Sequence, residues 1–508
     1  MPVLNASFHR FRVALLLPLL LLSCTDATGS SDGEIFISPG GPISLDALGD
    51  SVSLRVSQIR GGIPLPVEVQ YQSRDSSVVS VSTTGVARSV GGGSTVITAV
   101  APGGEMDSVA VTVDQIATVI EIEQDSAPIT LIAPQALLPI SCRALDRNGF
   151  ELTNPPTVTS ETGTVQGTSC GDLVAVHSGR DTLLIRSGAL EQKVPIALAL
   201  RPSVGSSLGH PLSIDSFPQG MLPWAPTLIR NAQGDLDLYT TGYFPDPTAP
   251  TGYRGDLHRL TSADNGSTFR YDGVALARDT LPCSVNGDGL ENVAIVPRAE
   301  GSGWRMFYSS GGFTCYGWQI FSAVSPDQRT WTREPGIRVD NGSPQPPQAP
   351  GPVPWPAGEG MVLDQLPGGE WRMISGSYER ITPAENKFQI VDWRSPDQLT
   401  WTYHGVLLST DDIGPEVNRS IYSPTIREFA PGIYRMIFTG DDLNVPGGRS
   451  RLYSAVSLDR TTWQVEGLLM GGAATDLFYS TLVDDLLVFI RADVGQPRSI
   501  GAERVLMP

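Results

Sequence analysis

Acidic residues that could exchange protons stand where apolar segments begin. Glu359 opens the segment Glu359-Gly360-Met361-Val362, Glu291 opens a second one, and Asp288 lies three residues before Glu291. Carboxylates gathered in one cavity repel one another, so at least one should hold its proton to a higher pH than a free glutamic acid. If the fold brings these segments together, the three residues predict a site for acid–base chemistry.

Tryptophan is confined to the C-terminal part of the chain, where all nine tryptophans follow residue 220. A tryptophan face can stack on a sugar ring through the apolar C–H surface of the sugar. Five of the tryptophans belong to repeated segments and are expected in the core. The remaining four are freer and are the candidates for substrate binding: Trp224, Trp318, Trp355 and Trp393.

Residues 205–508 contain a repeat. An aromatic-Arg-Met core occurs three times and a Ser-x-Asp turn four times, with the serines of successive turns 63, 70 and 62 residues apart. Such a period, with several strands per unit, is typical of β-propeller blades. The segment His210–Ser216 is expected to supply the outer strand of the last blade and so close the ring. The innermost strands of five blades are expected to begin near Ala225, Glu291, Glu359, Ser423 and Thr475.

The four repeated turns resemble the Asp box of sialidases and other propellers, and Ser262–Phe269 has the full form Ser-x-Asp-x-Gly-x-Thr-Phe. The aspartate of such a turn can accept hydrogen bonds from backbone amides, and the aromatic residue can pack between sheets. The resemblance implies a structural place on the outer rim, away from the substrate. The aspartates concerned are Asp264, Asp327, Asp397 and Asp459.

A five-bladed propeller with this strand pattern resembles the glycoside hydrolases of family 43, whose relatives cleave arabinan and xylan. In that family the catalytic carboxylates start innermost strands, and the general acid is a glutamate in a Glu-Gly-Pro-like motif on blade three. The resemblance makes Glu359 the proton donor to the leaving oxygen and places Asp288 and Glu291 near the carboxylate that tunes its pKa. It implies an inverting enzyme.

Blade one departs from the family pattern. The family has its general base there, an aspartate followed by proline, whereas this chain has Trp224-Ala225-Pro226. Since Ala225 cannot take a proton, the base would come from Asp246, after the second strand of blade one, or from Asp476 on blade five. If neither serves, the propeller is either a binding protein or an enzyme with a shifted mechanism.

Two β-rich segments precede the propeller. Residues 34–115 resemble the group 2 bacterial immunoglobulin-like domain through Ser73–Val81, Thr84–Ala87 and the glycine-rich segment Gly91–Ala99. Alternating Val and Ile residues there place one face of each strand in a core. Residues 116–202 are interpreted as a second, divergent immunoglobulin-like sandwich. Both are expected to be spacers, and the fold class is all-β: two sandwiches followed by the propeller.

The N-terminus is typical of an exported protein. A basic head precedes the ten-residue apolar run Val13–Leu22, which suits a signal peptide better than a membrane span. The run ends in Leu21-Leu22-Ser23-Cys24, which resembles the lipobox of bacterial lipoproteins and implies a lipid on Cys24. The alternative is an ordinary cleaved signal with a chance cysteine. Residues 25–33 are expected to be a flexible tether.

The four remaining cysteines are expected to form two disulfides, because an exported protein resides where disulfides persist. Their positions favour Cys142–Cys170 and Cys283–Cys315, since each pair falls within one expected domain. Four free thiols are the alternative.

Charge and composition exclude some functions. A formal net charge of -18 and a pI near 4.7 argue against a nucleic-acid partner, because phosphate binding needs a basic surface. The five histidines are scattered, so no metal or other cofactor is expected. The favoured interpretation is a monomeric, carbohydrate-active lipoprotein, anchored by lipid alone in the bacterial envelope, at the outer membrane or cell surface. The alternative is a non-catalytic glycan- or protein-binding adhesion or scaffold lipoprotein.

Overall fold

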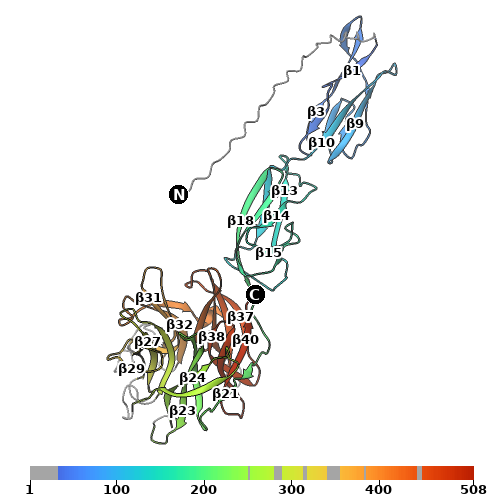
Figure 1. The fold of residues 1–508 in the computed structure, drawn as a ribbon. Helices are drawn as coiled ribbons and strands as arrows, with labels where there is room; N and C mark the ends of the chain where they lie inside the picture. The colour runs from blue at the N-terminus through green and yellow to red at the C-terminus, as the bar shows by residue number, and fades with distance from the viewer. Residues whose placement is uncertain are drawn as a thin grey trace, which may run out of the picture. The chain divides into compact units, whose positions relative to one another are not determined.

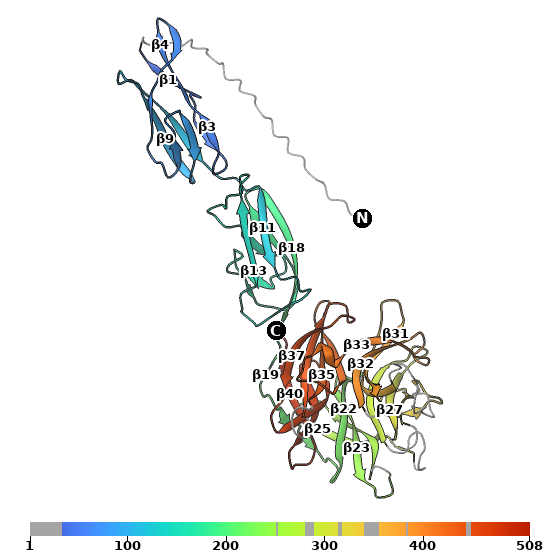
Figure 2. The same cartoon turned by 180° about the vertical axis from the view of Figure 1, so that it is seen from behind.

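The structure is a computed structural model that describes residues 33–249, 252–279, 289–312, 317–339, 355–382, 385–442 and 449–508. This part of the chain is almost entirely β-structure, and its one helical element is a short 3-10 turn, Thr410–Asp412. Within these residues no helix is long and apolar enough to span a bilayer. Residue contacts divide the chain into two compact units, one up to Val119 with Ala144–Asn154, the other Ile120–Arg143 with Pro155–Pro508. The strands are coloured along the chain in Figure 1 and seen from behind in Figure 2.

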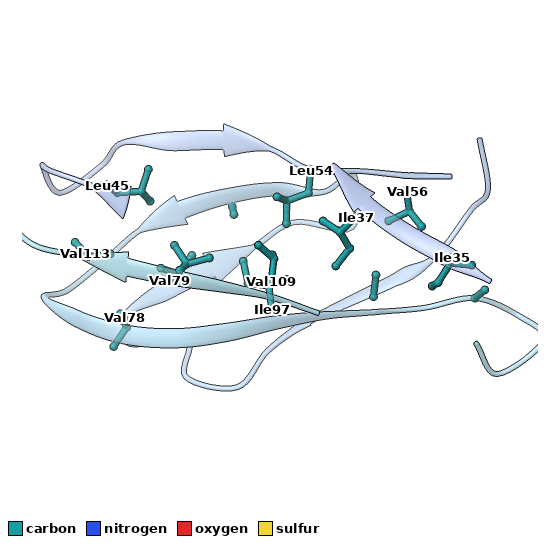
Figure 3. Close-up of a cluster of buried hydrophobic side chains, with 14 residues drawn as sticks. Ile35, Ile37, Leu45, Leu54, Val56, Val78, Val79, Ile97, Val109 and Val113 are labelled. Atoms are coloured by element: carbon teal, nitrogen blue, oxygen red, sulfur yellow. The ribbon is translucent and has the colours of Figure 1, made fainter. Parts of the chain in front are cut away.

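The first unit encloses an apolar core between small sheets (Figure 3). Its longest strands alternate between buried and exposed side chains, so that Val109, Val111 and Val113 point inward together with Ile97 and Ala99. This alternation is the pattern from which the segment was predicted to form strands. The sheet orders are β1-β4-β5, β2-β10-β9-β6 and β3-β8-β7, with strands β1 (Ile35–Ser38), β2 (Ile43–Leu45), β3 (Ser51–Ser53), β4 (Arg55–Arg60), β5 (Ile63–Pro66), β6 (Gln70–Ser73), β7 (Val79–Val81), β8 (Val86–Ser89), β9 (Gly93–Val100) and β10 (Met106–Val113).

The next segment forms a second set of sheets around its own core, with a disulfide inside it. Cys142 and Cys170 are joined, which confirms that predicted pair. Cys24, Cys283 and Cys315 lie outside the described residues. The sheet orders are β11-β13, β12-β18-β17-β14 and β15-β16, with strands β11 (Val119–Gln124), β12 (Thr130–Ile132), β13 (Ile140–Leu145), β14 (Thr157–Ser160), β15 (Val165–Gln166), β16 (Val174–Ala175), β17 (Gly179–Ser187) and β18 (Leu190–Leu200).

Five antiparallel sheets follow one another in the rest of the chain, and their innermost strands form a closed ring. β22 lies beside β26, β26 beside β30, β30 beside β34, β34 beside β38, and β38 again beside β22. This is a five-bladed propeller, as predicted. Blade one is β22 (Leu222–Arg230), β23 (Leu236–Pro245), β24 (Tyr253–Ser262) and β25 (Phe269–Leu276); blade two is β26 (Gly289–Pro297), β27 (Trp304–Gly312), β28 (Gly317–Ser325) and β29 (Thr332–Arg333); blade three is β30 (Trp355–Gln365), β31 (Trp371–Thr382), β32 (Glu385–Ser395) and β33 (Thr402–Leu408); blade four is β34 (Ser420–Ala430), β35 (Ile433–Asp442), β36 (Arg449–Ser457) and β37 (Gln464–Met470); blade five is β38 (Thr475–Val483), β39 (Leu486–Asp493) and β40 (Ser499–Leu506).

The segment before blade one closes the ring, but it divides its strands between two blades. β20 (His210–Pro211) pairs antiparallel with β40 of blade five, as predicted for the outer strand, and β19 (Ser203–Val204), which precedes the predicted segment, pairs antiparallel with the same strand. β21 (Ile214–Asp215) instead pairs parallel with β25 of blade one. One short segment thereby covers two exposed sheet edges, which joins the last blade to the first.

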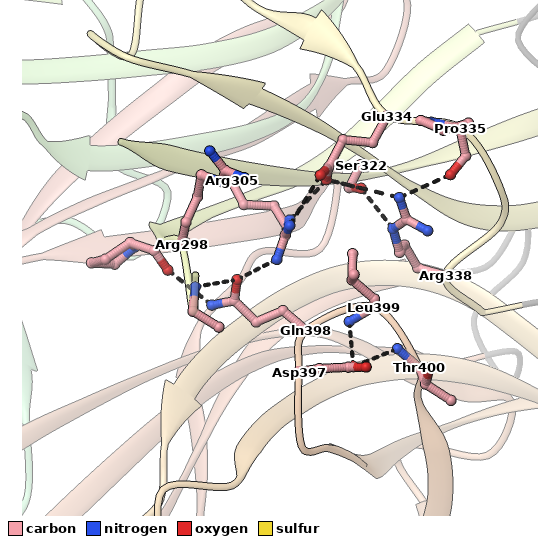
Figure 4. A network of polar contacts seen from close by, with 12 residues as sticks. Arg298, Arg305, Ser322, Glu334, Pro335, Arg338, Asp397, Gln398, Leu399 and Thr400 are labelled. Atoms are coloured by element: carbon pink, nitrogen blue, oxygen red, sulfur yellow. Dashed lines mark hydrogen bonds and ion pairs between the residues drawn. The ribbon is translucent and has the colours of Figure 1, made fainter. Parts of the chain in front are cut away.

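The repeated Ser-x-Asp turns attach each blade to the blade before it. In blade three, Gln398 Oε1 accepts hydrogen bonds from Arg305 Nη1 at 2.7 Å and from the Ala299 N–H at 3.0 Å, both on blade two (Figure 4). The Trp401 ring meets Phe307 of blade two edge-on, with centroids 5.6 Å apart. Asp397 Oδ1 accepts from two amide N–H groups of its own turn at 2.8 Å each. These contacts confirm the predicted structural role of the turns.

Candidate functional site

A local irregularity recurs where each innermost strand begins. In every blade, a residue of that strand has a positive φ where the pairing with the second strand shifts register; β30 of blade three has a second such residue, Gly358. Such a bulge bends the strand and re-aims the neighbouring side chain. The other positive-φ residues, one in each innermost strand, are Ala225 (42°), Asn292 (55°), Gly360 (69°), Ser423 (52°) and Tyr479 (54°).

The residues directly before the bulges occupy one equivalent position in the five blades. They are Trp224, Glu291, Glu359, Tyr422 and Phe478. On blade one, therefore, it is Trp224 rather than Ala225 that stands in the place of the two glutamates. Neither residue is an acid, so blade one has no carboxyl group at the position that Glu291 and Glu359 occupy on blades two and three.

Glu291 is buried, with 3% of its surface exposed, and is held by two aromatic donors. Tyr243 Oη donates a hydrogen bond to its Oε1, and the Trp224 indole N–H donates to the same carboxyl group. Tyr243 lies on β23 and Trp224 on β22, so blade one positions the glutamate of blade two.

Glu359 is also buried, with 7% exposed, and receives a hydrogen bond from the Tyr479 hydroxyl of blade five. Asn292, the bulge residue of blade two, links the two glutamates. Its Nδ2 lies 3.5 Å from Glu359 Oε2, and its Oδ1 accepts the Gly360 N–H at 3.1 Å. Ser309 fixes the same amide, since Asn292 Nδ2 also donates to Ser309 Oγ at 3.1 Å. The bulge geometry of blade two thus orients the acid of blade three.

The two glutamates hold protons more tightly than a solvated carboxyl. Burial raises the pKa of Glu291, and the charge of Glu359 raises it further. Burial likewise raises the pKa of Glu359, partly opposed by its hydrogen bonds from Tyr479 and Asn292. Both directions follow from the cost of placing a charge in a dry site next to a like charge. The pair therefore retains a proton where a free glutamic acid is ionised.

A third carboxyl, Asp441, belongs to the same electrostatic cluster. It lies at the end of β35 and is half-buried, and its charge acts on Glu359. Ser450 Oγ donates to its Oδ1 at 2.7 Å, and Tyr422 Oη lies 3.4 Å from the same oxygen. Burial raises the pKa of Asp441 to about 6. Asp441 was not predicted, although it ends the second strand of blade four, close to the place that the predicted candidate Asp246 has after the second strand of blade one.

Aromatic rings surround the carboxyls in a chain of contacts. Trp224 meets Phe478 and Tyr479 with centroid distances of 5.1 and 4.9 Å, and Tyr479 meets Tyr422 at 5.5 Å. Phe388 extends the chain at 5.7 Å from Tyr422. Trp224, Tyr422 and Phe388 are half-buried, which leaves part of each ring accessible. Tyr422 and Phe478 were not predicted, because their positions before the bulges of blades four and five depend on the pairing between strands.

The two proposed replacements for the base each lie beside an arginine, and the charge of Asp476 also acts on Asp441. Asp246 accepts from Thr248 and forms an ion pair with Arg254 at 2.9 Å, and its pKa is lowered, chiefly by Thr248. Asp476 accepts the Ser450 N–H at 3.0 Å and lies 3.9 Å from Arg449. Both acids are engaged by cations, in contrast to the buried glutamates.

The four candidate tryptophans also differ from one another. Trp224 lies at the carboxyl cluster, as described. Trp393 is 5% exposed and packs in the core between blades two and three, so its indole is a core side chain and offers no stacking face. Trp318 lies on β28, and Trp355 begins β30. Asp288 lies outside the described residues. Within the described part of the chain, no group of three or more metal-binding side chains occurs.

Comparisons with known proteins give distant structural matches only. No family model and no curated protein matches the chain. A Bacillus subtilis arabinanase is 15% identical, with a TM-score of 0.39, over 56% of this chain and 94% of its own. A thermostable family 43 glycoside hydrolase is 12% identical (TM-score 0.43; 59% and 93%), and a Bacteroides thetaiotaomicron endo-arabinase is 13% identical (TM-score 0.39; 59% and 98%). Similarity at this level assigns no activity to this chain.

Proposed function

We propose that this protein binds a glycan at the centre of the propeller and hydrolyses a glycosidic bond there. The observation that carries the proposal is the pair Glu291 and Glu359, buried at equivalent bulges of adjacent blades and lined by half-buried aromatic rings. A protonated carboxyl is what a leaving sugar oxygen requires, and ring faces are what sugars stack on.

In this mechanism Glu359 is the general acid. Its proton passes to the oxygen of the glycosidic bond as the bond between that oxygen and the anomeric carbon breaks. The hydrogen bonds from Tyr479 and Asn292 stabilise the carboxylate that remains. Glu291 beside it favours retention of a proton by the pair, because two carboxyls in one dry site do not both ionise readily.

Asp441 is the general base in this mechanism, in place of the blade-one aspartate that this chain lacks. A carboxyl with a pKa of about 6 is ionised at neutral pH and can remove a proton from a water molecule. That water then adds to the anomeric carbon, on the face opposite the departing oxygen. Afterwards Asp441 releases its proton to solvent and Glu359 takes one up from solvent. Atoms and charge balance as hydrolysis with inversion.

Glycan binding without cleavage is the second candidate, and Trp224 favours it. This residue occupies on blade one the position that carries carboxyls on blades two and three, so a stacking surface replaces an acid there. A propeller of this kind would retain its aromatic site and cleave nothing.

We further propose that the propeller is displayed on the bacterial envelope. A lipid on Cys24 would anchor it, residues 25–33 would tether it, and two immunoglobulin-like modules at 34–115 and 116–202 would hold the monomeric propeller away from the membrane. This arrangement rests on the sequence patterns of the N-terminal part. Replacing Cys24 with Ser should release the protein from the membrane fraction, and continued membrane association of the variant would refute the anchor.

The activity is tested by screening the full-length mature chain for release of reducing ends from plant and microbial polysaccharides. Wild type should cleave at least one of them, and Glu359→Gln should abolish cleavage while keeping the thermal unfolding temperature and glycan affinity. Glu300→Gln, in the exposed turn between β26 and β27, is the matched control and should cleave as wild type does. Binding without cleavage by wild type would instead select the second candidate.

A further inference from the structure

Arg498 stands at the entrance to the carboxyl site. It lies in the loop between β39 and β40, and that loop is at the end of blade five where the innermost strand begins, since Thr475 pairs with Asp493. The Arg498 side chain is exposed. Its guanidinium carbon lies 4.0 Å from the centre of the Trp224 ring and 5.8 Å from that of Phe478.

Arg498 differs from other arginines at this end of the propeller. Arg254, Arg278 and Arg491 each form an ion pair with an aspartate, at 2.9, 2.8 and 2.8 Å. Among the described residues, Arg498 makes ring contacts but no hydrogen bond and no ion pair. Arg419, whose charge acts on Asp441, likewise has no ion pair among the described residues, but Arg498 is the one that rests on the ring of Trp224 beside Glu291.

Glu291 does not supply the missing partner. Glu291 lies near enough to act electrostatically on Arg498, but its carboxyl is engaged by Tyr243 and Trp224 and forms no ion pair with the guanidinium. Within the described part of the chain, no acid therefore pairs with the guanidinium of Arg498. Resting on an indole face keeps a guanidinium in place at low entropic cost and leaves the N–H donors in its own plane free.

We infer that the glycan bound here is acidic and that Arg498 recognises its carboxylate, as in a uronic acid. A planar fork of N–H donors matches a carboxylate in a bidentate pair, and neutral sugar hydroxyls need no such cation. Trp224 takes part in both contacts, since its ring can stack on the sugar and also supports the guanidinium. This inference rests on the proposed function and narrows its substrate class.

Matched glycan pairs test the inference. Oligogalacturonate, oligoguluronate and glucuronoxylan oligosaccharides are compared with their carboxyl-reduced forms, which keep each linkage and lose only the charge. Affinities are measured by calorimetry with the full-length mature chain. Wild type should bind at least one acidic oligosaccharide roughly tenfold or more tightly than its reduced form, the range expected for a charge-assisted hydrogen-bonded pair.

Variants at Arg498 separate recognition from general electrostatics. Arg498→Gln should remove the preference for the acidic form, and Arg498→Lys should keep part of it, because lysine retains the charge and loses the fork. Arg329→Gln, an exposed position in the blade-two turn that loses the same charge, should keep the full preference.

The outcomes distinguish this inference from the proposed function. Equal or better binding of the neutral forms, or an acid preference that survives Arg498→Gln, overturns the role of Arg498 while leaving glycan binding intact. If no glycan in the panel binds, whether acidic or reduced, the proposed function fails together with the inference.

Discussion

Carboxyl groups at the rim of the propeller and at its axis differ in the direction of their pKa shifts. At the rim, Asp327 is exposed and accepts the amide N–H groups of Arg329 and Thr330 at 2.8 and 2.9 Å. These hydrogen bonds, that of Thr330 first, hold its pKa below the ordinary value. At the axis, burial raises the pKa of Glu291 and Glu359.

The two sets of carboxyl groups also differ in how regularly they recur from blade to blade. The rim aspartates recur in four blades at one position of one turn, and each satisfies the same backbone amides. The axis position before the bulge changes from blade to blade, through Trp, Glu, Glu, Tyr and Phe. A residue needed by the architecture must repeat with the blades, whereas a residue needed by a reaction at the axis must be different on each side of the substrate.

The largest effect on kcat among these predictions is expected at Asp441, the proposed base, because no rim aspartate is proposed to act as a base. Asp441→Asn should lower kcat by about 100- to 10,000-fold, the contribution typical of a positioned acid or base. In wild type the rate should fall as the pH drops below about 6, because Asp441 becomes protonated. The measurement is kcat against pH on a cleaved glycan.

Asp476→Asn is the matched control, since Asp476 also accepts a hydrogen bond from Ser450 and was one of the bases predicted from sequence. It should keep the reaction and its low-pH limb, moved to lower pH, because the charge of Asp476 contributes to the raised pKa of Asp441. If Asp476→Asn or Asp246→Asn abolishes the reaction while Asp441→Asn does not, the assignment of the base is wrong.

A smaller effect concerns the stability of the axis. Because folding raises the pKa of Glu291, its contribution to stability is full at low pH and is lost as the pH rises through the raised value. Glu291→Gln removes this loss. The variant should resemble wild type near pH 4 and be more stable above pH 8, by on the order of 1–3 kcal/mol. Thermal and urea unfolding at the two pH values measure this, and a variant equally destabilised at both would contradict it.

The smallest effect is expected at the rim. Asp327→Ala should destabilise the fold by about 1 kcal/mol, the usual cost of losing a side chain that caps backbone amides. Asp327→Asn keeps an acceptor oxygen and should cost less. Both variants should cleave glycans at the wild-type rate, measured per folded molecule. A loss of activity in either would mean that the rim is not purely architectural.

Much of the propeller could be predicted from sequence because its turns repeat. The Ser-x-Asp segments set the period, and the structure confirms five blades and the amide contacts of the aspartates. The ring closure was half predicted, because β20 and β21 pair with different blades and a two-residue strand carries no periodic signal.

The site was less predictable. Glu291 and Glu359 were found as acids that start strands, but the bulge shifts the equivalent residue of blade one from Ala225 to Trp224, and a register shift depends on pairing between strands. Asp441 and Tyr243 enter the site from the ends of second strands. Trp393 was expected to be free, yet interblade packing buries it.

The central claim, that the axis pair holds a proton which the rim does not, can be tested by infrared difference spectroscopy of the carboxyl groups at pH 7. Wild type should show the carbonyl band of a protonated, buried carboxyl, shifted on exchange into deuterium oxide. The band should disappear or change in Glu359→Gln and Glu291→Gln and persist in Asp327→Asn. A wild-type spectrum with only ionised carboxylates at pH 7, or a band removed by the rim variant and kept by both axis variants, would contradict the account.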